Sequence, residues 1–561
     1  MVRFLAVLVR NLVVATFALL VLPGRAVRAR RRPEWVRFKL AGDPPYRLVR
    51  RRWLQLRRAE PEVVRSLEQL RTQLALLAAD PRVKGAVFEL DGFAGSAAKR
   101  ASIALLFQTL RAAGKQVVGF AVSAGNGELE LLCAADRIAM PPAGRLELTG
   151  FSAEATALGV GLKRLGVEAQ FIRRGEHKTA PELFTNEVVS PIQRETIERL
   201  LDERYEALVA ALARGRKLAP EEARARVDEG PYSAKRAKVR GLIDAVVSRA
   251  DLGRFLAGLP IPAPAEIDPK EKGPRLAPFD AYAASLLWAP GTWKRLLRRP
   301  RLAVVPLGGM IVHGRGVGPR FSGSETIARA LRSAAKDARC RAIVLHIDSP
   351  GGSALGSELI LDEVKRAAKK KPVVAYFDEV AASGGYMAAL GGTEIWAAPL
   401  AVAGSIGVFA GKFDLSGLLG RLGVHRTLVT RGKNAGLFSS SRGFTESERA
   451  ALEAEIEETY VDFLDHVATA RKRTREDIRA KAEGRIYSGR AAVEAGLVDR
   501  TGLFDDACRR ALELAGRPVA EFDVAVFAPA APRFSLGRIL RQLGQARMLA
   551  LWHPWLEFPV R

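Results

Sequence analysis

A serine that could act as a nucleophile lies in the small-residue segment Ala381-Ala-Ser-Gly-Gly-Tyr386. Ser383 ends an apolar run and begins a helical pattern. Neighbouring N–H groups and the helix N-terminus would therefore favour developing negative charge there. The segment differs from the G-x-S-x-G turn of hydrolases, and a lone serine here is more often a helix cap. Nucleophilic chemistry at Ser383 depends on a base.

Histidine and lysine are the two residue types that could supply this base. His346 and His177 have no partner pattern in the sequence, so we expect both to be structural. A lysine can serve when burial lowers its pKa. Lys178, in Gly175-Glu-His-Lys-Thr-Ala180, differs from the many surface lysines only by the pattern around it.

A glycine-rich turn, Ser349-Pro-Gly-Gly352, follows another apolar run. Gly351 and Gly352 would let backbone N–H groups approach a ligand closely, as an oxyanion hole requires. An isolated Pro-Gly-Gly is more often a tight turn only. The turn is thus a candidate that needs support from the rest of the chain.

The chain contains a repeat of domain size. The pairs at an offset of 257 include Asp91 and Asp348, Gly150 and Gly407, and Arg164-Leu-Gly-Val167 and Arg421-Leu-Gly-Val424. Further on, the offset becomes 255, where Gly241-Leu-Ile-Asp244 matches Gly496-Leu-Val-Asp499. A period this long indicates two copies of one fold rather than a solenoid.

The two copies have lost complementary groups. Asn126 stands where the second copy has Ser383, and Ala435 stands where the first copy has Lys178. Lys433 falls opposite Glu176 in the same register. We therefore predict one active site per chain, with the serine from the second copy and the lysine from the first.

Each copy reads as alternating strands and helices, which predicts an α/β fold with a parallel or mixed sheet. In the second copy we expect strands over 342–347 and 372–377 and helices over 357–371, 382–390 and 446–472. The segment Thr445-Glu-Ser-Glu448 predicts a capping box for the long helix. A Pro-rich linker over 258–300 separates the copies and has room for a short helix.

Composition excludes several protein classes. The 561 residues are 48% hydrophobic and 27% charged, which excludes a disordered chain and a multi-span membrane protein. Three separated cysteines exclude a disulfide scaffold and a cysteine-type zinc site. No H-E-x-x-H or P-loop motif occurs, so we expect neither metal nor cofactor.

The N-terminus suggests contact with a membrane. An apolar stretch over 4–22 is interrupted by Arg10 and Asn11 and makes a marginal anchor. Between Arg25 and Arg58 lie 13 Lys and Arg residues against two acids, a composition that suits lipid headgroups or nucleic acid, or an ordinary solvated surface. This positive flank argues against export of the body. The tail from Phe534 to Arg561 reads as a basic amphipathic helix, on a membrane or packed on the protein.

Taken together, the motifs resemble the long, duplicated bacterial form of the signal peptide peptidase A family over about residues 60–515. They are Ile347-Asp-Ser-Pro-Gly-Gly-Ser353, Ala382-Ser-Gly-Gly-Tyr386, Gly404-Ser-Ile-Gly-Val408, Gly175-Glu-His-Lys-Thr-Ala180 and Gly484-Arg-Ile-Tyr-Ser-Gly489. The resemblance implies two tandem Clp-protease/crotonase-like β-α-β units and a Ser-Lys endopeptidase. It assigns the nucleophile to Ser383, the base to Lys178, a hydrogen bond to the lysine to Ser405, and the oxyanion donors to the backbone at Gly351, Gly352 and Gly384.

The same resemblance implies peptide substrates, namely signal-peptide remnants and other unfolded hydrophobic segments, and a homotetramer on the bacterial cytoplasmic membrane. We expect a membrane surface and no nucleic acid as partner. The expected boundaries are an anchor and basic segment over 1–58, the lysine-bearing repeat over 59–257, the linker, the serine-bearing repeat over 301–518 and a tail over 519–561. Two alternatives stay open: a crotonase-type acyl-CoA enzyme and a catalytically inactive membrane scaffold.

Overall fold

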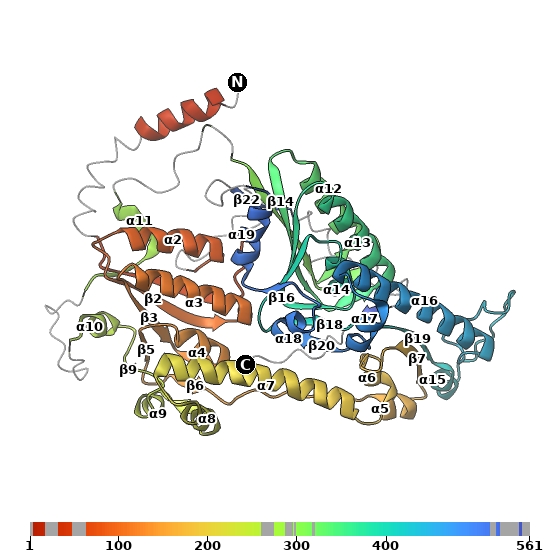
Figure 1. Ribbon diagram of the computed structural model, residues 1–561. Coiled ribbons are helices and arrows are strands. Elements are labelled where there is room, and N and C mark those ends of the chain that lie inside the picture. The colour runs from red at the N-terminus through yellow and green to blue at the C-terminus, as the bar shows by residue number, and fades with distance from the viewer. Residues whose placement is uncertain are drawn as a thin grey trace. The chain divides into compact units, whose positions relative to one another are not determined.

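The computed structural model describes residues 4–16, 32–47, 63–259, 274–286, 296, 299–316, 320–516, 523–527 and 549–551. The chain divides into two compact units (Figure 1). Unit 1 comprises Met1–Phe151, Arg204–Arg299 and Val560–Arg561, and unit 2 comprises Ser152–Glu203 and Pro300–Pro559.

Unit 1 is built on a parallel sheet of order β10-β1-β2-β3-β5-β9. Its strands are β1 (Trp35–Gly42), β2 (Gly85–Phe93), β3 (Gln116–Ala121), β5 (Arg137–Met140), β9 (Ala245–Val246) and β10 (Leu276–Pro278). A small second sheet contains β4 (Ser123–Gly125), β6 (Arg145–Glu147) and β8 (Tyr232–Ser233). The helices are α2 (Leu67–Ala79), α3 (Ala97–Ala112), α4 (Asn126–Leu132), α8 (Pro220–Asp228), α9 (Ala234–Val239), α10 (Leu252–Ala257) and α11 (Phe279–Ser285).

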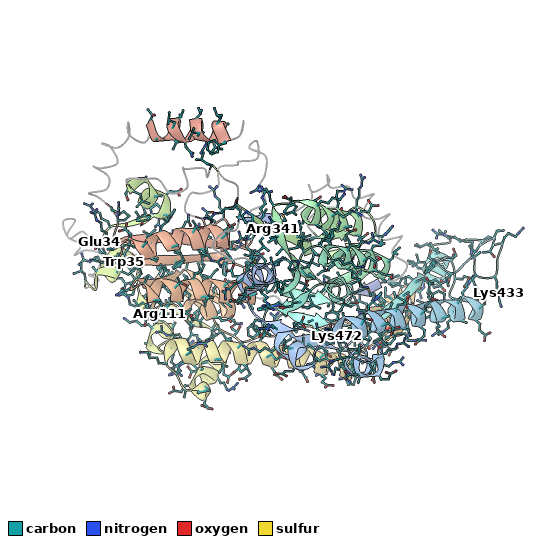
Figure 2. The ribbon with its side chains drawn as sticks, turned by 45° about the horizontal axis from the view of Figure 1, so that its top comes forward. Glu34, Trp35, Arg111, Arg341, Lys433 and Lys472 are labelled. Carbon is teal, nitrogen blue, oxygen red and sulfur yellow. The ribbon has the colours of Figure 1, made fainter. Side chains whose placement is uncertain are left out.

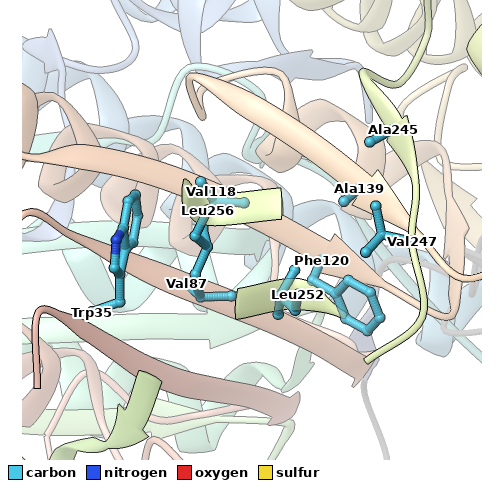
Figure 3. Packing of buried hydrophobic residues seen from close by; sticks show 9 residues of the cluster. All are labelled: Trp35, Val87, Val118, Phe120, Ala139, Ala245, Val247, Leu252 and Leu256. Atoms are coloured by element: carbon cyan, nitrogen blue, oxygen red, sulfur yellow. The ribbon is translucent and has the colours of Figure 1, made fainter. Parts of the chain in front are cut away.

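The core of unit 1 lies on this sheet, where β-branched and aromatic side chains of successive strands pack together. Figure 3 shows Trp35, Val87, Val118 and Phe120 in one cluster with Leu252 of α10. Trp35 is only 2% exposed. Because β1 supplies this tryptophan, that strand of the expected basic segment is part of the hydrophobic core.

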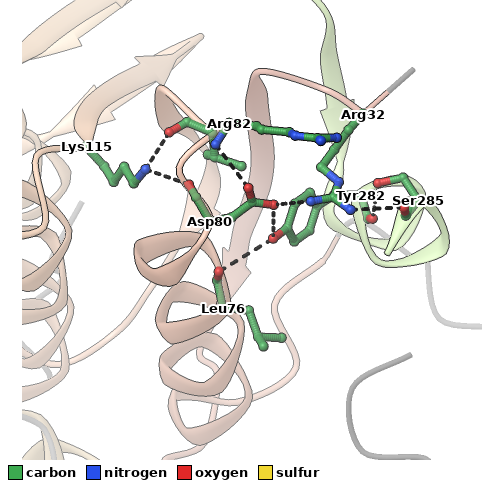
Figure 4. Close-up of polar contacts among 8 residues, drawn as sticks. Arg32, Leu76, Asp80, Arg82, Lys115, Tyr282 and Ser285 are labelled. Carbon is green, nitrogen blue, oxygen red and sulfur yellow. Dashed lines mark hydrogen bonds and ion pairs between the residues drawn. The ribbon is translucent and has the colours of Figure 1, made fainter. Parts of the chain in front are cut away.

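A polar cluster ties the N-terminal segment to a helix within the expected linker (Figure 4). Asp80 accepts hydrogen bonds from Arg32 at 2.8 Å and from the Tyr282 hydroxyl at 3.1 Å. Lys115 donates to the Asp80 carbonyl at 2.6 Å. Although burial acts to raise the pKa of the Asp80 carboxyl, the Arg82 backbone N–H, the Arg32 guanidinium and the Tyr282 hydroxyl together hold that pKa below its usual value.

Unit 2 contains two sheets. The larger follows the order β20-β18-β16-β14-β11-β22, with β17 paired to β16 and β21 paired to β17. The smaller follows β13-β12-β15-β23-β19-β7. The larger sheet uses β11 (Arg301–Gly308), β14 (Cys340–Ser349), β16 (Val373–Ala382), β17 (Glu394–Ala397), β18 (Val402–Gly404), β20 (Ile486–Ser488), β21 (Arg500–Thr501) and β22 (Asp523–Val526). The smaller uses β7 (Glu168–Arg174), β12 (Met310–Val312), β13 (Phe321–Gly323), β15 (Gly351–Ser353), β19 (Val408–Asp414) and β23 (Leu549–Leu551).

The helices of unit 2 are α5 (Gly159–Arg164), α6 (Glu182–Thr185), α12 (Ser324–Lys336), α13 (Ala354–Ala368), α14 (Gly384–Ala389), α15 (Ser416–Arg421), α16 (Glu446–Arg471), α17 (Arg475–Lys481), α18 (Gly489–Glu494) and α19 (Phe504–Leu514). Three of them, α13, α14 and α16, lie near the expected positions 357–371, 382–390 and 446–472. Helix α7 (Pro191–Arg216) runs across the division between the units. Thr445 and Glu448 form the predicted capping box of α16.

The mixed α/β architecture with parallel sheets confirms the predicted fold class. The expected boundaries need correction. Strand β1 pairs with β2, β10 pairs with β1, and β22 pairs with β11, so parts of the expected basic segment, linker and tail are sheet strands. Leu549–Leu551 is likewise a strand rather than part of a terminal helix, and the rest of Phe534–Arg561 lies outside the described residues. Local periodicity could not reveal these edges because their partners are distant in sequence.

A helix covers residues 4–16 within the apolar N-terminal stretch, and residues 17–22 lie outside the described ranges. In the described parts of the chain, no helix has both the length and the apolar character needed to cross a bilayer.

Candidate active site

Lys178 and Ser383 meet in the interior of unit 2. The Lys178 Nζ donates a hydrogen bond of 2.7 Å to the Ser383 Oγ. Lys178 is 1% exposed and Ser383 is 0% exposed. The first sequence copy therefore contributes its lysine to the compact unit that carries the serine, as the complementary losses predict.

Ser383 lies between β16 and α14 in a backbone conformation unusual for its residue type. Its φ is 53°, in the left-handed region, which a non-glycine residue adopts at a free-energy cost. Its backbone N–H donates to the Gly404 carbonyl at 2.7 Å, and its carbonyl accepts from Met387. These bonds hold the strained turn, which aims the hydroxyl at the lysine.

The turn also requires a glycine directly after the serine. A Cβ at Gly384 would lie 2.2 Å from the Ser357 Oγ and 3.3 Å from the Gly352 nitrogen. The nucleophile turn is therefore packed directly on the start of α13 and on β15, and no side chain fits between them.

Lys178 is positioned by strand pairing and by a loop of the second copy. Strand β7 pairs antiparallel with β19, from Arg174 opposite Val408 to Glu168 opposite Asp414. After β7, the His177 N–H donates to the Glu483 carbonyl at 2.6 Å. A Cβ at Gly484 would lie 2.3 Å from the Lys178 nitrogen, so this glycine permits the close approach.

Ser405 completes the surroundings of the amine. The Lys178 Nζ donates to the Ser405 Oγ and to the Ser405 carbonyl, each at 3.0 Å. Ser405 also has a left-handed backbone, with φ of 53°. With Ser383, these contacts give the amine three oxygen acceptors within hydrogen-bond distance.

Burial lowers the pKa of Lys178 well below its usual value, because the interior disfavours the ammonium form. An amine that is neutral near physiological pH can accept a proton, whereas an exposed lysine at that pH cannot. The arrangement places a serine hydroxyl in contact with a buried amine whose pKa is lowered, as a nucleophile with a neighbouring base would require.

The glycines of the Ser349-Pro-Gly-Gly352 turn lie beside this pair. Gly351 has φ of 101° and Gly352 has φ of 155°. The Gly351 N–H donates to the Ser349 Oγ at 3.2 Å, and this side chain in turn donates to the Gly309 carbonyl at 2.6 Å. Because its N–H is used in this way, Gly351 shapes the turn, and Gly352 and Gly384 are the better candidates for oxyanion donors.

The two candidate histidines make contacts of their own. His346 lies on β14 with its Nε2 3.3 Å from an oxygen of Asp378, and its ring stacks on Tyr376. His177 contributes its backbone to the loop contact with Glu483. Within the described ranges, no three His, Cys, Asp or Glu side chains gather as metal ligands would.

Lys433, the second-copy lysine nearest to the position that matches Lys178, does not lie beside Ser383. Lys433 and Ala435 are exposed, and Figure 2 shows Lys433 on the segment that extends away from the body of the unit. Neither residue contributes to the contacts of Ser383.

The sequence missed the role of the loop that holds the lysine. Glu483 accepts from the Glu176 N–H at 3.1 Å through its carboxylate, and Tyr460 of α16 donates to the same carboxylate at 2.9 Å. The Gly484-Arg-Ile-Tyr motif was the available signal, but nothing in its spacing relates it to a lysine more than 300 residues away.

Comparison with known proteins identifies the family of the chain. Peptidase family S49 matches residues 109–257 and 365–517, one region in each copy. The chain is 30% identical to "Serine protease SPPA, chloroplastic" of Arabidopsis thaliana over 86% of this chain and 70% of that protein. It is 31% identical to "Protease 4" of Salmonella typhi over 78% of this chain and 70% of that protein.

Among solved structures, a ClpP1 mutant from Listeria monocytogenes is similar over 37% of this chain and 94% of that chain, with 16% identity and a TM-score of 0.25. The family assignment rests on the sequence matches, which cover more than half of the chain in two tandem regions. The chain therefore belongs to peptidase family S49 and is a serine peptidase.

Proposed function

We propose that this peptidase uses a Ser-Lys dyad, with Ser383 as nucleophile and Lys178 as general base. The observation that carries the proposal is the 2.7 Å hydrogen bond between a fully buried amine and the serine hydroxyl. Membership in family S49 favours peptide hydrolysis over the acyl-CoA chemistry that the fold alone would allow.

Neutral Lys178 takes the hydroxyl proton as the Ser383 Oγ attacks a peptide carbonyl. The N–H groups of Gly352 and Gly384 stabilise the oxyanion. Lys178 then protonates the leaving amine, which breaks the peptide bond and leaves an acyl group on Ser383. Water, deprotonated by the same amine, releases the acid product. Ser405 is a positioning residue that orients the amine through two contacts.

A fluorophosphonate probe tests this dyad. We expect labelling at Ser383 in the native chain and loss of labelling in Lys178→Ala, because the hydroxyl then lacks its base. Lys433→Ala is the matched control and should label normally. Labelling that survives in Lys178→Ala but disappears in Lys433→Ala would show that the base is Lys433 and overturn the proposal.

We propose that the substrates are signal-peptide remnants and other extended hydrophobic peptides, and that the protein associates with a membrane. The apolar stretch over 4–22 and the basic residues after it support the membrane proposal. The experiment is fractionation of the full chain and of a chain lacking residues 1–30, a deletion that keeps Arg32 and β1. The full chain should sediment with membranes, and the shortened chain should be more soluble. A full chain wholly in the soluble fraction at low salt contradicts the proposal.

We further propose a homo-oligomer, a tetramer by family resemblance. The repeat supports it, because the pairing of β7 with β19 has no second instance in the described chain. The segments at the corresponding positions, 425–431 and 151–157, belong to no strand. Exposed apolar side chains accompany the later segment, with Leu422 67% and Val429 77% exposed. Pairing of this segment with 152–157 of a second copy would repeat the β7–β19 register and generate a ring.

The register makes the assembly testable at single residues. Ala410 lies opposite Ile172, so by the offset of 257 Ala153 should lie opposite Val429 of another copy. Ala153→Cys with Val429→Cys should form an intermolecular disulfide under mild oxidation, whereas Ala153→Cys with Thr427→Cys should form much less. Equal yields from both pairs, or a monomer in light scattering at micromolar concentration, contradict this interface.

A further inference from the structure

We propose that the C-terminal strand β23 of this chain occupies the peptide-binding position of its own active site. The inference builds on the proposed function, because it assumes that the groove beside Ser383 receives extended peptides.

The smaller sheet of unit 2 places β23 between two strands of the site. In its order, β13-β12-β15-β23-β19-β7, β23 separates β15 from β19. It pairs antiparallel with β15, with Leu551 opposite Gly351, Ala550 opposite Gly352 and Leu549 opposite Ser353. On its other side, Leu549 lies opposite Phe409 of β19.

Both strands that flank β23 border the dyad. Strand β15 contains Gly352, whose nitrogen would lie 3.3 Å from a Cβ at Gly384, the residue after the nucleophile. Strand β19 begins after Gly407, where a Cβ would lie 3.3 Å from the Lys178 Cδ. One flank therefore touches the nucleophile turn, and the other begins beside the base.

On the side away from β23, each flanking strand pairs with another strand of the sheet. Strand β12 bridges to β15 through Ile311 and Gly352, and β7 pairs with β19 along its length. The space between β15 and β19 therefore holds one strand. An extended segment there can bond backbone groups on both sides, which is the way peptides add to sheets.

The occupant has the chemistry expected of a peptide for this position. The segment Met548-Leu-Ala-Leu-Trp552 is an uncharged apolar run within a tail rich in arginine. It is supplied by the same chain, so its local concentration is high compared with that of a free peptide. A tethered segment with an affinity of about 0.1 mM for the groove, at an effective concentration of about 1 mM, would weaken binding of a competing peptide about tenfold.

The experiment measures binding in Ser383→Ala chains, so that no peptide is consumed. The probe is a fluorescein-labelled synthetic peptide with the sequence of residues 546–554, followed by fluorescence anisotropy. A chain ending after Gln545 should bind the probe about tenfold more tightly than the full chain. A chain ending after Glu557, which keeps β23, is the matched control and should match the full chain.

A second variant avoids the loss of the tail. Ala550→Pro in the full-length Ser383→Ala chain removes a backbone N–H from β23 and should bind the probe like the chain ending after Gln545. Equal affinity of the full and shortened chains, or no binding by either, overturns the inference. Tighter binding to the shortened chain together with absence of hydrolysis in the native protein would leave it standing and reject the proposed activity instead.

Discussion

Ser383 in unit 2 and Asn126 in unit 1 occupy matching positions of the sequence repeat, but their side chains make different contacts. Ser383 contacts the buried amine of Lys178. Asn126, 3% exposed, donates to the Gly150 carbonyl at 2.6 Å and accepts from the Thr149 N–H at 3.2 Å. Both polar ends of the asparagine side chain are therefore used in holding the backbone of its own copy.

The residues and backbone conformations around Ser383 and Asn126 also differ. The position of Ser405 is taken in the first copy by Leu148, which is 0% exposed. Ser383 has a left-handed backbone, whereas Asn126 is not among the residues with positive φ. The second copy has two serines and a strained turn, whereas the first copy has a leucine in place of one serine and an asparagine whose hydrogen bonds are satisfied. The second copy thus carries the serine that contacts Lys178, whereas the matching asparagine of the first copy holds its own backbone.

The dyad variants give the largest expected effect on this comparison. Ser383→Ala and Lys178→Ala should each lower kcat for a fluorogenic peptide by about 10⁴-fold, because each removes one member of a pair that acts as a unit. Circular dichroism should show a retained fold. Lys433→Ala should keep most activity, and a serious loss there would mean that the second copy supplies its own base.

Replacement of Ser405 tests the positioning of the amine. Ser405→Ala leaves the carbonyl contact but removes the Oγ contact, so we expect kcat to fall by roughly 10- to 100-fold. The pH profile should shift as well, since one acceptor near the amine is lost. Ser405→Thr, which keeps a hydroxyl, should recover part of the activity. An unchanged profile would show that Ser405 has a packing role only, like Leu148 in the first copy.

Paired glycine substitutions compare the two turns directly. Gly384→Ala should lower activity at least about tenfold, because a Cβ would meet the Ser357 Oγ at 2.2 Å and displace the nucleophile turn. In the first copy, a Cβ at Gly127 would meet the flexible Arg100 guanidinium at 3.0 Å. Gly127→Ala should therefore be nearly neutral in a peptidase assay. Equal losses would indicate that both turns are equally constrained.

We expect Asn126→Ala to lower the free energy of unfolding more than Ser383→Ala does, although Ser383→Ala costs more activity. Asn126→Ala removes the two hydrogen bonds to the backbone of Gly150 and Thr149 and should lower the free energy of unfolding by about 1–3 kcal/mol. Ser383→Ala should change it by less than about 1 kcal/mol, because the Lys178 amine keeps its contacts with Ser405. Urea titrations of the two variants give the comparison, and a larger loss for Ser383→Ala contradicts it.

The smallest expected effect is a pH-dependent gain in stability from Lys178→Met. Burial lowers the pKa of this amine below 10.5 in the folded chain. Between the lowered pKa and 10.5, the unfolded chain therefore binds a proton that the folded chain does not, so Lys178 destabilises the fold as pH falls from 10.5. We expect Lys178→Met to melt a few degrees higher at pH 7, with a smaller gain at pH 10. A gain that does not change with pH would reflect packing alone.

The sequence by itself determined the repeat, the complementary losses and the residue types of the site. Ser383 and Lys178 were singled out by motifs that stand in this chain, and Ser405 was implied by the family resemblance. Apolar periodicity gave the approximate positions of α13 and α14, and the capping residue Thr445 gave the start of α16. These features are local, because a cap, a turn or an amphipathic face is formed by residues a few positions apart.

Only the tertiary structure decided which segments meet. Residues 152–203 of the first copy join unit 2 through the pairing of β7 with β19, and β1, β10 and β22 extend sheets whose other strands are far away in sequence. The same holds for Glu483, which fixes the Lys178 loop, and for β23 beside Gly352. Strand partners are chosen by burial and backbone hydrogen bonding across hundreds of residues. Local sequence periodicity carries no record of that choice.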